Sequence, residues 1–150
     1  RVQGKAVGGG VGMACAGDYC FATKFSSIKL SELAVGIGPF VVGPAVERKS
    51  GLSAYSTLSI NATKWFDAEW AREKGIYSEI FDSNDEMDKE ISLLIKELVE
   101  SNPEAIKKLK EVFWSGTTHW DKLLEERAEY SGQLVLSDFT KQAIARFKTK

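Results

Sequence analysis

The chain has 150 residues, 43% of them hydrophobic and 27% charged, a composition that supports a packed core and argues against disorder over most of its length. The net charge of -1 gives no electrostatic reason to expect a nucleic acid or a membrane as partner. Cys15 and Cys20 have neither zinc-site nor disulfide-framework spacing, and one histidine is too few for a metal site. We therefore expect no metal, and two reduced thiols in a cytoplasmic protein.

The first part of the chain has a glycine-rich α/β pattern. In chain order it predicts a strand, a small-residue helix, two extended segments, a Gly/Pro turn, three helices and a last strand. These cover residues 2–7, 11–16, 18–22, 27–32, 36–39, 40–49, 53–60, 67–74 and 76–81. The chain starts within the first strand pattern and without Met, so we expect the natural protein to have an N-terminal part before Arg1.

From residue 85 onward the pattern predicts helices alone. Ile91, Leu94, Ile95 and Leu98 recur at helical spacing on one face of a charged helix. Further helices are predicted over residues 103–114, 118–136 and 139–147, the last capped by Ser137 and Asp138. We divide the chain into a core, residues 1–84, and a helical region, residues 85–150, that packs on the same core or on a neighbouring subunit.

Three consecutive glycines, Gly8, Gly9 and Gly10, follow the first strand and open a helix. Backbone N–H groups at a helix N-terminus lack intrahelical partners and bind anions, either a phosphate or a developing oxyanion. The run fits neither a P-loop nor a Rossmann dinucleotide motif. A tight turn with close helix packing explains the triplet equally well.

Glu32 lies in a largely apolar segment, between Leu30 and Leu33, just before a Gly/Pro loop. A carboxylate among apolar neighbours has a raised pKa and can act as a general acid or base near neutral pH. The alternative is a solvated glutamate at the edge of a loop, and the residues by themselves favour it.

Taken together, residues 4–14, 18–22, 31–32 and 36–39 resemble the signature region of the crotonase (enoyl-CoA hydratase/isomerase) superfamily. Gly51, Ala68, residues 71–75 and residues 139–147 fit its later part. The resemblance implies an α/β fold of ββα turns wound into a spiral, with only the second half in this chain. It also implies a helical C-terminal region that assembles a homotrimer or a hexamer made as a dimer of trimers. No cofactor is expected, because the acyl-CoA substrate itself carries coenzyme A.

The resemblance also assigns roles to residues. Gly9 matches one of the two backbone N–H donors that hold the thioester oxyanion, and Gly8 and Gly10 flank it at the substrate. The other donor belongs to a part of the family upstream of this chain, so we expect the chain alone to be inactive. Glu32 matches one of the two hydratase glutamates, whereas Gly12, also expected at the substrate, stands where the second glutamate is usual.

Two further departures accompany Gly12: Ser31 replaces a usual proline, and residues 39–44 replace the common Gly-Gly-Thr-Gln run. The combination resembles the bacterial methylglutaconyl-CoA hydratase-like branch of leucine catabolism, which implies hydration of a branched enoyl-CoA. The alternatives are an enoyl-CoA isomerase, a hydroxyacyl-CoA hydrolase, and a non-catalytic acyl-CoA-binding or assembly homologue.

Two residue groups are candidates for substrate contacts. Phe40, Trp65 and Phe66 are candidates for the wall of the acyl pocket, although aromatic residues at such positions are more often plain core. Lys141, Arg146 and Lys148 are candidates for the phosphates of coenzyme A, although a frayed basic terminus is the more common explanation.

Overall fold

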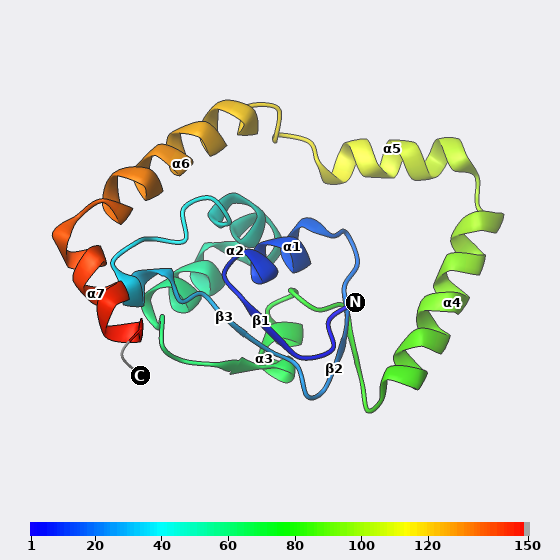
Figure 1. The fold of residues 1–150 in the computed structure, drawn as a ribbon. Helices are drawn as coiled ribbons and strands as arrows, with labels where there is room; N and C mark the ends of the chain where they lie inside the picture. The colour runs from blue at the N-terminus through cyan, green and yellow to red at the C-terminus, as the bar shows by residue number, and fades with distance from the viewer. Residues whose placement is uncertain (149–150) are drawn as a thin grey trace.

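The chain up to β5 builds an α/β core, and the four helices that follow run around it as an arm (Figure 1). The computed structural model describes residues 1–148, with the side chains of residues 1–146. The core elements are β1 (Lys5–Val7), α1 (Gly9–Ala16), β2 (Phe21–Thr23), β3 (Ser27–Lys29), the 3-10 helix η1 (Glu32–Val35), α2 (Gly43–Ile60), β4 (Phe66–Asp67), α3 (Ala68–Glu73) and β5 (Glu79–Phe81). The arm consists of α4 (Asn84–Glu100), α5 (Pro103–Phe113), α6 (Trp120–Val135) and α7 (Asp138–Lys148).

The strands form two small sheets. One has the order β1-β3-β4, with β1 and β3 parallel and β3 and β4 antiparallel. The other pairs β2 with β5 in parallel, and a bridge between Val2 and Ala22 extends it. Parallel neighbours need a crossover connection, and here helices supply much of it, as α/β chains require.

The hydrophobic core lies between α1, α2, α3 and the strands. Its buried members are Val11, Cys15, Cys20, Ala22, Ile28, Leu30, Val46, Leu58, Phe66, Ala68, Ala71, Ile76 and Tyr77. Both cysteines are free thiols, and burial raises the pKa of Cys15 to about 12 and that of Cys20 above its ordinary value. Thiols that stay protonated are poor nucleophiles, so these two act as apolar packing groups.

Several predicted boundaries differ from the structure by a few residues, as for the strands β1, β2, β3 and β5. The break predicted between the helices 40–49 and 53–60 is confirmed, because the two parts of α2 meet at Gly51, whose φ of 78° and ψ of 160° are not helical. The extended segment predicted up to Glu32 ends at Lys29, and Glu32 instead begins η1. This helical turn is closed by a hydrogen bond of 3.0 Å from the Ile37 N–H to the Glu32 carbonyl and by Gly36, which adopts φ 85°. Hydrophobic periodicity reveals neither feature.

The helices predicted after residue 85 are present as α4 to α7, and side chains cap three of them. The Ser83 side chain accepts from Glu86 N–H at the start of α4, and the Asn102 side chain accepts from Glu104 N–H at the start of α5. The Ser137 hydroxyl accepts from Thr140 N–H at 3.3 Å, as expected for the cap of α7. None of the helices within residues 1–148 has the length and hydropathy of a membrane span.

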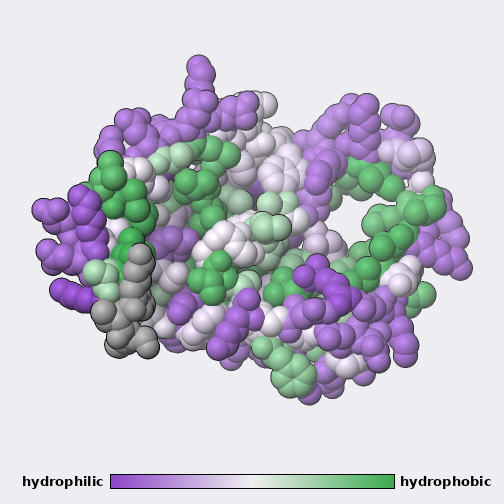
Figure 2. Space-filling view, viewed as in Figure 1, coloured by the Kyte–Doolittle hydropathy of each residue, from purple (hydrophilic) through white to green (hydrophobic). Residues whose placement is uncertain are grey.

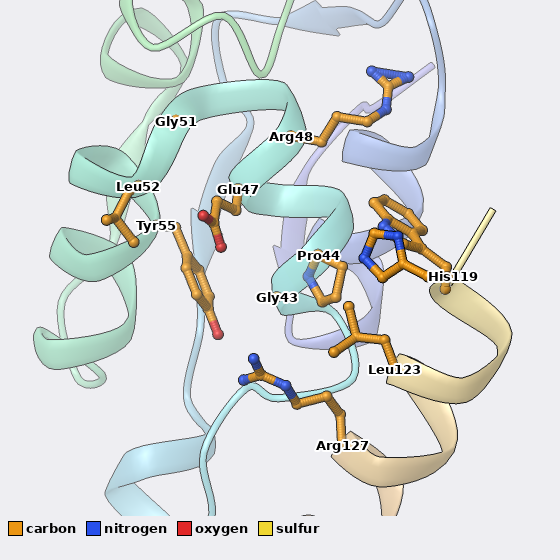
Figure 3. A pocket seen from close by; sticks show the side chains of 11 residues that line it. Gly43, Pro44, Glu47, Arg48, Gly51, Leu52, Tyr55, His119, Leu123 and Arg127 are labelled. Atoms are coloured by element: carbon orange, nitrogen blue, oxygen red, sulfur yellow. The ribbon is translucent and has the colours of Figure 1, made fainter. Parts of the chain in front are cut away.

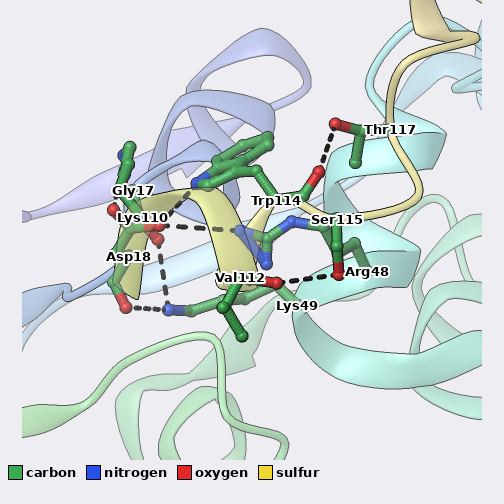
Figure 4. A network of polar contacts seen from close by, with 9 residues as sticks. All are labelled: Gly17, Asp18, Arg48, Lys49, Lys110, Val112, Trp114, Ser115 and Thr117. Atoms are coloured by element: carbon green, nitrogen blue, oxygen red, sulfur yellow. Dashed lines mark hydrogen bonds and ion pairs between the residues drawn. The ribbon is translucent and has the colours of Figure 1, made fainter. Parts of the chain in front are cut away.

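An ion-pair cluster around Asp18 ties α5 to the core (Figure 4). Trp114 Nε1 donates to Asp18 Oδ1 at 2.7 Å, Lys110 pairs with Oδ2, and Arg48 lies 3.6 Å from Oδ1. The Arg48 guanidinium also stacks 3.9 Å from the centre of the Trp114 ring. Burial favours the neutral carboxyl, but the hydrogen bonds from Lys110 and Trp114 and the charges of Lys110 and Arg48 outweigh it and lower the pKa of Asp18.

The end of the arm returns to the core at η1. Thr140 on α7 is fully buried, and its hydroxyl donates to the Gly36 carbonyl at 3.3 Å. A Cβ built on Gly36 would lie 2.5 Å from Cδ1 of Phe139, so the α7 side chains rest directly on the glycine backbone. The last helix therefore holds the loop that begins with Glu32.

The helices α4 and α5, which lead up to the Asp18 anchor, present an apolar surface. Figure 2 shows green side chains along it where it faces an opening beside the core. The large apolar side chains of α4 and α5 that are exposed include Leu93, Ile95, Leu98, Val99, Leu109, Val112 and Phe113. Exposed apolar area of this extent is typical of a surface that meets another protein segment.

Candidate active site

The glycine triplet forms the turn from β1 into α1. Gly8 is the N-cap residue with φ 52° and ψ -113°, a conformation that favours glycine, and its carbonyl accepts from Val11 and Gly12 N–H. Gly9 and Gly10 begin the helix and are exposed. Their N–H groups have no hydrogen-bond partner among the described residues, as expected for the first turn of a helix. The predicted anion-binding turn is therefore available at the surface.

The carboxylate of Glu32 lies against this turn. A Cβ built on Gly8 would be 2.9 Å from Glu32 Oε1, so only a glycine at position 8 lets the carboxylate approach this closely. Glu32 Oε2 is buried and has no hydrogen-bond partner among the described residues. Burial raises the pKa of Glu32, while the backbone amides of Glu32 and Ser31 act in the opposite direction. The structure thus brings a carboxyl group with a raised pKa to the free helix N-terminus.

A cavity of about 110 Å³ opens beside Glu32, and its lining residues are Glu32, Ile37, Gly38, Pro39, Phe40, Val41, Val42 and Ser131. The Phe40 ring packs over Gly38, where a Cβ would be 2.3 Å from its Cζ atom, and meets the Tyr130 ring edge-on at 5.8 Å. The wall is therefore apolar apart from Glu32 and the Ser131 hydroxyl. We call this cavity the Glu32 pocket.

Gly12, where the resemblance implies that a second glutamate is usual, is buried in α1. A Cβ built on it would lie 2.7 Å from Val42 Cγ1 and 3.0 Å from Val42 Cβ. The Val42 side chain thus fills the space into which a side chain at position 12 would extend. Because Val42 also lines the Glu32 pocket, apolar atoms occupy the side of the pocket that faces Gly12.

Of the three aromatic residues predicted for the wall of the acyl pocket, two lie away from Glu32. Phe66 is buried in the hydrophobic core. The Trp65 ring lies under the ammonium groups of Lys5 and Lys29, at 4.9 and 4.4 Å from its centre. Neither residue lines the Glu32 pocket, whereas Phe40 does.

The basic candidates belong to α7, the helix that packs on η1. Lys141 is exposed and pairs with Asp138 at 3.9 Å. Arg146 is exposed as well, and the side chain of Lys148 lies outside the described residues. They stay predictions for the phosphates of coenzyme A.

Sequence reasoning missed Val42 and Ser131 as pocket residues. Val42 is one of several apolar residues in its segment, and nothing in the sequence shows that it faces Gly12. Ser131 lies about a hundred positions from Glu32 along the chain, and only the return of the arm brings it near. Such contacts have no local signal.

Comparisons with known proteins show the family and the fold of this chain. The family model described as "Enoyl-CoA hydratase/isomerase" matches residues 1–149. Among solved structures, an enoyl-CoA hydratase from Mycobacterium avium is 24% identical, with a TM-score of 0.89, over 98% of this chain and 57% of its own. An enoyl-CoA hydratase/isomerase from Pseudoalteromonas atlantica T6c is 18% identical, with a TM-score of 0.87, over 97% and 59%.

A third structure, an enoyl-CoA hydratase from Bacillus halodurans, is 24% identical with a TM-score of 0.84, over 97% of this chain and 59% of that one. The chain therefore spans less than two thirds of the length of these solved relatives, and at these identities the likeness shows the fold alone. A search of curated proteins gives no match. The match of the family model over nearly the whole chain places this protein in the enoyl-CoA hydratase/isomerase family, within the crotonase superfamily.

Proposed function

We propose that the protein, as a full-length enzyme, adds water to an α,β-unsaturated acyl-CoA, with Glu32 as its acid/base group. The observation that carries the proposal is the contact between the Glu32 carboxyl and the Gly8 turn, next to the free N–H of Gly9. An acid/base group and an oxyanion donor have to act on neighbouring atoms of one thioester, and this arrangement supplies both together.

The proposed reaction needs one proton shuttle. Ionised Glu32 takes a proton from water as the water oxygen bonds to the β-carbon of the enoyl group. The electron pair of the double bond then moves onto the thioester oxygen, and the Gly9 N–H stabilises that charge. The enolate collapses, the α-carbon takes the proton from Glu32, and the carboxylate is regenerated. A backbone donor of this kind contributes about 3 kcal/mol to the transition state.

The raised pKa of Glu32 suits this role, since a group that both accepts and returns a proton works best with a pKa near the working pH. The filled space at Gly12 means that no second carboxylate holds the water from that position. We propose a branched, methylglutaconyl-like acyl group as substrate, based on the resemblance described above and on the apolar wall around Glu32.

The same filled space favours enoyl-CoA isomerisation as the second candidate. An isomerase removes a proton from one carbon and returns it to another, and a single carboxylate can do both without positioning water. Val42 at the position of the second glutamate excludes water from part of the pocket, as that reaction requires.

We also propose that the enzyme is a homotrimer or a dimer of trimers, in which the apolar side chains of α4 and α5 meet other protein surface. Coenzyme A phosphates would meet basic residues of α7, since that helix packs on the loop of Glu32. Both proposals follow the family resemblance.

The test is a substrate panel on the full-length protein, with straight and branched enoyl-CoA thioesters. Loss of absorbance of the conjugated thioester and release of free CoA are recorded in the same samples, and products are separated by chromatography. Hydration gives absorbance loss and a 3-hydroxyacyl-CoA without free CoA.

Other outcomes reject the proposal. A shifted double bond without uptake of water would establish the isomerase instead. Free CoA released from a hydroxyacyl-CoA would indicate a hydrolase. Binding of acyl-CoA without any turnover would indicate a non-catalytic homologue.

A further inference from the structure

A second and larger cavity lies between α2 and α6, with a volume of about 490 Å³ (Figure 3). Its wall includes Pro44, Glu47, Tyr55, His119, Leu123 and Arg127. The family reaction described above uses none of these residues. We call this larger cavity the α2–α6 cavity.

Arg48 of this wall also has buried nitrogens without a hydrogen bond but lies 3.6 Å from Asp18, whereas Arg127 has no acidic partner among the described residues. The Arg127 Nε atom is buried and has no hydrogen-bond partner, and the guanidinium has no ion pair within the described part of the chain. Arginine keeps its positive charge, so a guanidinium N–H that is removed from water needs an acceptor. The edge of a guanidinium, with parallel N–H groups, matches the two oxygens of a carboxylate.

The surroundings of Arg127 are suited to an anion. Figure 3 shows its guanidinium pointing at the hydroxyl end of Tyr55, with the Glu47 carboxylate near the opposite end of that ring. Glu47 is exposed and makes no ion pair with Arg127. The first residues of α2, Gly43 and Pro44, also line the cavity, and the positive end of a helix dipole favours negative charge there.

The α2–α6 cavity is next to the Glu32 pocket. Ser131, one turn beyond Arg127 on α6, lines the Glu32 pocket. The Tyr55 hydroxyl donates to the Pro39 carbonyl at 3.1 Å, and Pro39 lines the same pocket. The segment 39–43 therefore separates the two cavities, with Tyr55 and α6 in contact with both sides.

We infer that the α2–α6 cavity binds a carboxylate group, with Arg127 as its ion-pair partner. The carboxylate belongs either to the far end of the acyl group of the substrate or to a free small dicarboxylate. The first source rests on the proposed function, because it requires an acyl-CoA in the Glu32 pocket. The second source does not depend on it.

The test compares full-length wild type with Arg127→Met, Arg127→Lys and the control Arg72→Met. Methionine keeps much of the side-chain length without the charge, and lysine keeps the charge without the paired N–H groups. Arg72 is an exposed arginine on α3 that bonds Glu69. The substrates are glutaconyl-CoA and 2-pentenoyl-CoA, which share a five-carbon acyl chain but end in a carboxylate and a methyl group. Binding of free glutarate is measured by calorimetry on the same proteins.

If the substrate supplies the carboxylate, Arg127→Met raises KM for glutaconyl-CoA by about tenfold or more, the loss expected for a charged hydrogen bond. KM for 2-pentenoyl-CoA stays unchanged, and Arg127→Lys is intermediate. If a free dicarboxylate is the ligand, wild type and Arg72→Met bind glutarate, Arg127→Met does not, and both KM values stay unchanged.

The inference is overturned by two results taken together. The first is that KM for the two substrates changes equally or not at all, and the second is that glutarate does not bind or binds equally well without Arg127. If the wild type turns over neither thioester, the proposed function fails, while the glutarate measurement still decides about the cavity. If Arg127→Met does not fold, Arg127→Lys decides by the same readouts.

Discussion

The contact between Gly12 and Val42 gives a prediction that can be worked out from the structure. A methyl group added at Gly12 meets Val42 Cγ1 at 2.7 Å and Val42 Cβ at 3.0 Å, distances that force the valine to shift. Replacing Val42 with alanine removes the nearer atom. Gly12→Ala and Val42→Ala should therefore compensate each other when combined.

The expected free energies follow from opposing effects. Overpacking costs about 1–3 kcal/mol, while alanine is about 1 kcal/mol better than glycine inside a helix. Gly12→Ala should thus lower the free energy of unfolding by about 0–2 kcal/mol. Val42→Ala removes two methyl groups from a half-buried side chain and costs about 1 kcal/mol. The double variant should be more stable than their sum by about 1 kcal/mol.

The assay is urea denaturation of full-length single and double variants. Gly132→Ala is the matched control, because Gly132 lies in α6 with nothing within 4 Å of a built Cβ. It should stabilise the protein and be additive with Val42→Ala. The reasoning is refuted if Gly12→Ala and Val42→Ala add within about 0.5 kcal/mol, the limit for independent sites. It also fails if Gly12→Ala stabilises as much as the control.

Three further predictions concern stability. Because the pKa of Glu32 is raised, the folded state holds the proton of this carboxyl more tightly than the unfolded state does. The free energy of unfolding should therefore fall as the pH rises from about 4.3 through the raised pKa, and Glu32→Gln should abolish this decline in urea titrations. The lowered pKa of Asp18 stabilises the folded state above about pH 3.9, and this stabilisation is lost as the pH falls. Asp18→Asn should lower the free energy of unfolding by about 1 kcal/mol and speed proteolysis of the arm. An unchanged cleavage rate would contradict the role of Asp18 as an anchor. Gly36 has φ 85°, and a Cβ added to it would lie 2.5 Å from Phe139 Cδ1. Gly36→Ala should therefore lower the free energy of unfolding, measured in urea, by about 1–3 kcal/mol, and a neutral effect would disprove the contact.

The arm shows what a sequence can predict. Its helices depend on local signals such as Pro103 at a first turn and Ser137 at a cap, and the structure has both where expected. The family pattern likewise predicted that the glycine triplet and Glu32 belong to one site, and the structure brings Glu32 against Gly8. Here the signal is carried by residue types at fixed spacing.

The remaining features depend on contacts between distant segments. The helical turn at Glu32 requires Gly36 in a left-handed conformation, held under α7. Val42 fills the space at Gly12 because α1 and α2 pack closely, and the Arg127 Nε atom is buried where α6 faces α2 across the cavity. Periodicity describes one element at a time, so it could not predict these contacts.

The most direct test of the central claim is the rate of hydration by full-length Glu32→Gln, compared with wild type and Glu73→Gln. Glu73 is an exposed carboxylate at the end of α3 and serves as the control. If Glu32 moves the proton, kcat for an enoyl-CoA falls by about 10² or more in Glu32→Gln, while Glu73→Gln keeps the wild-type rate. Wild-type turnover by a folded Glu32→Gln enzyme would contradict the assignment.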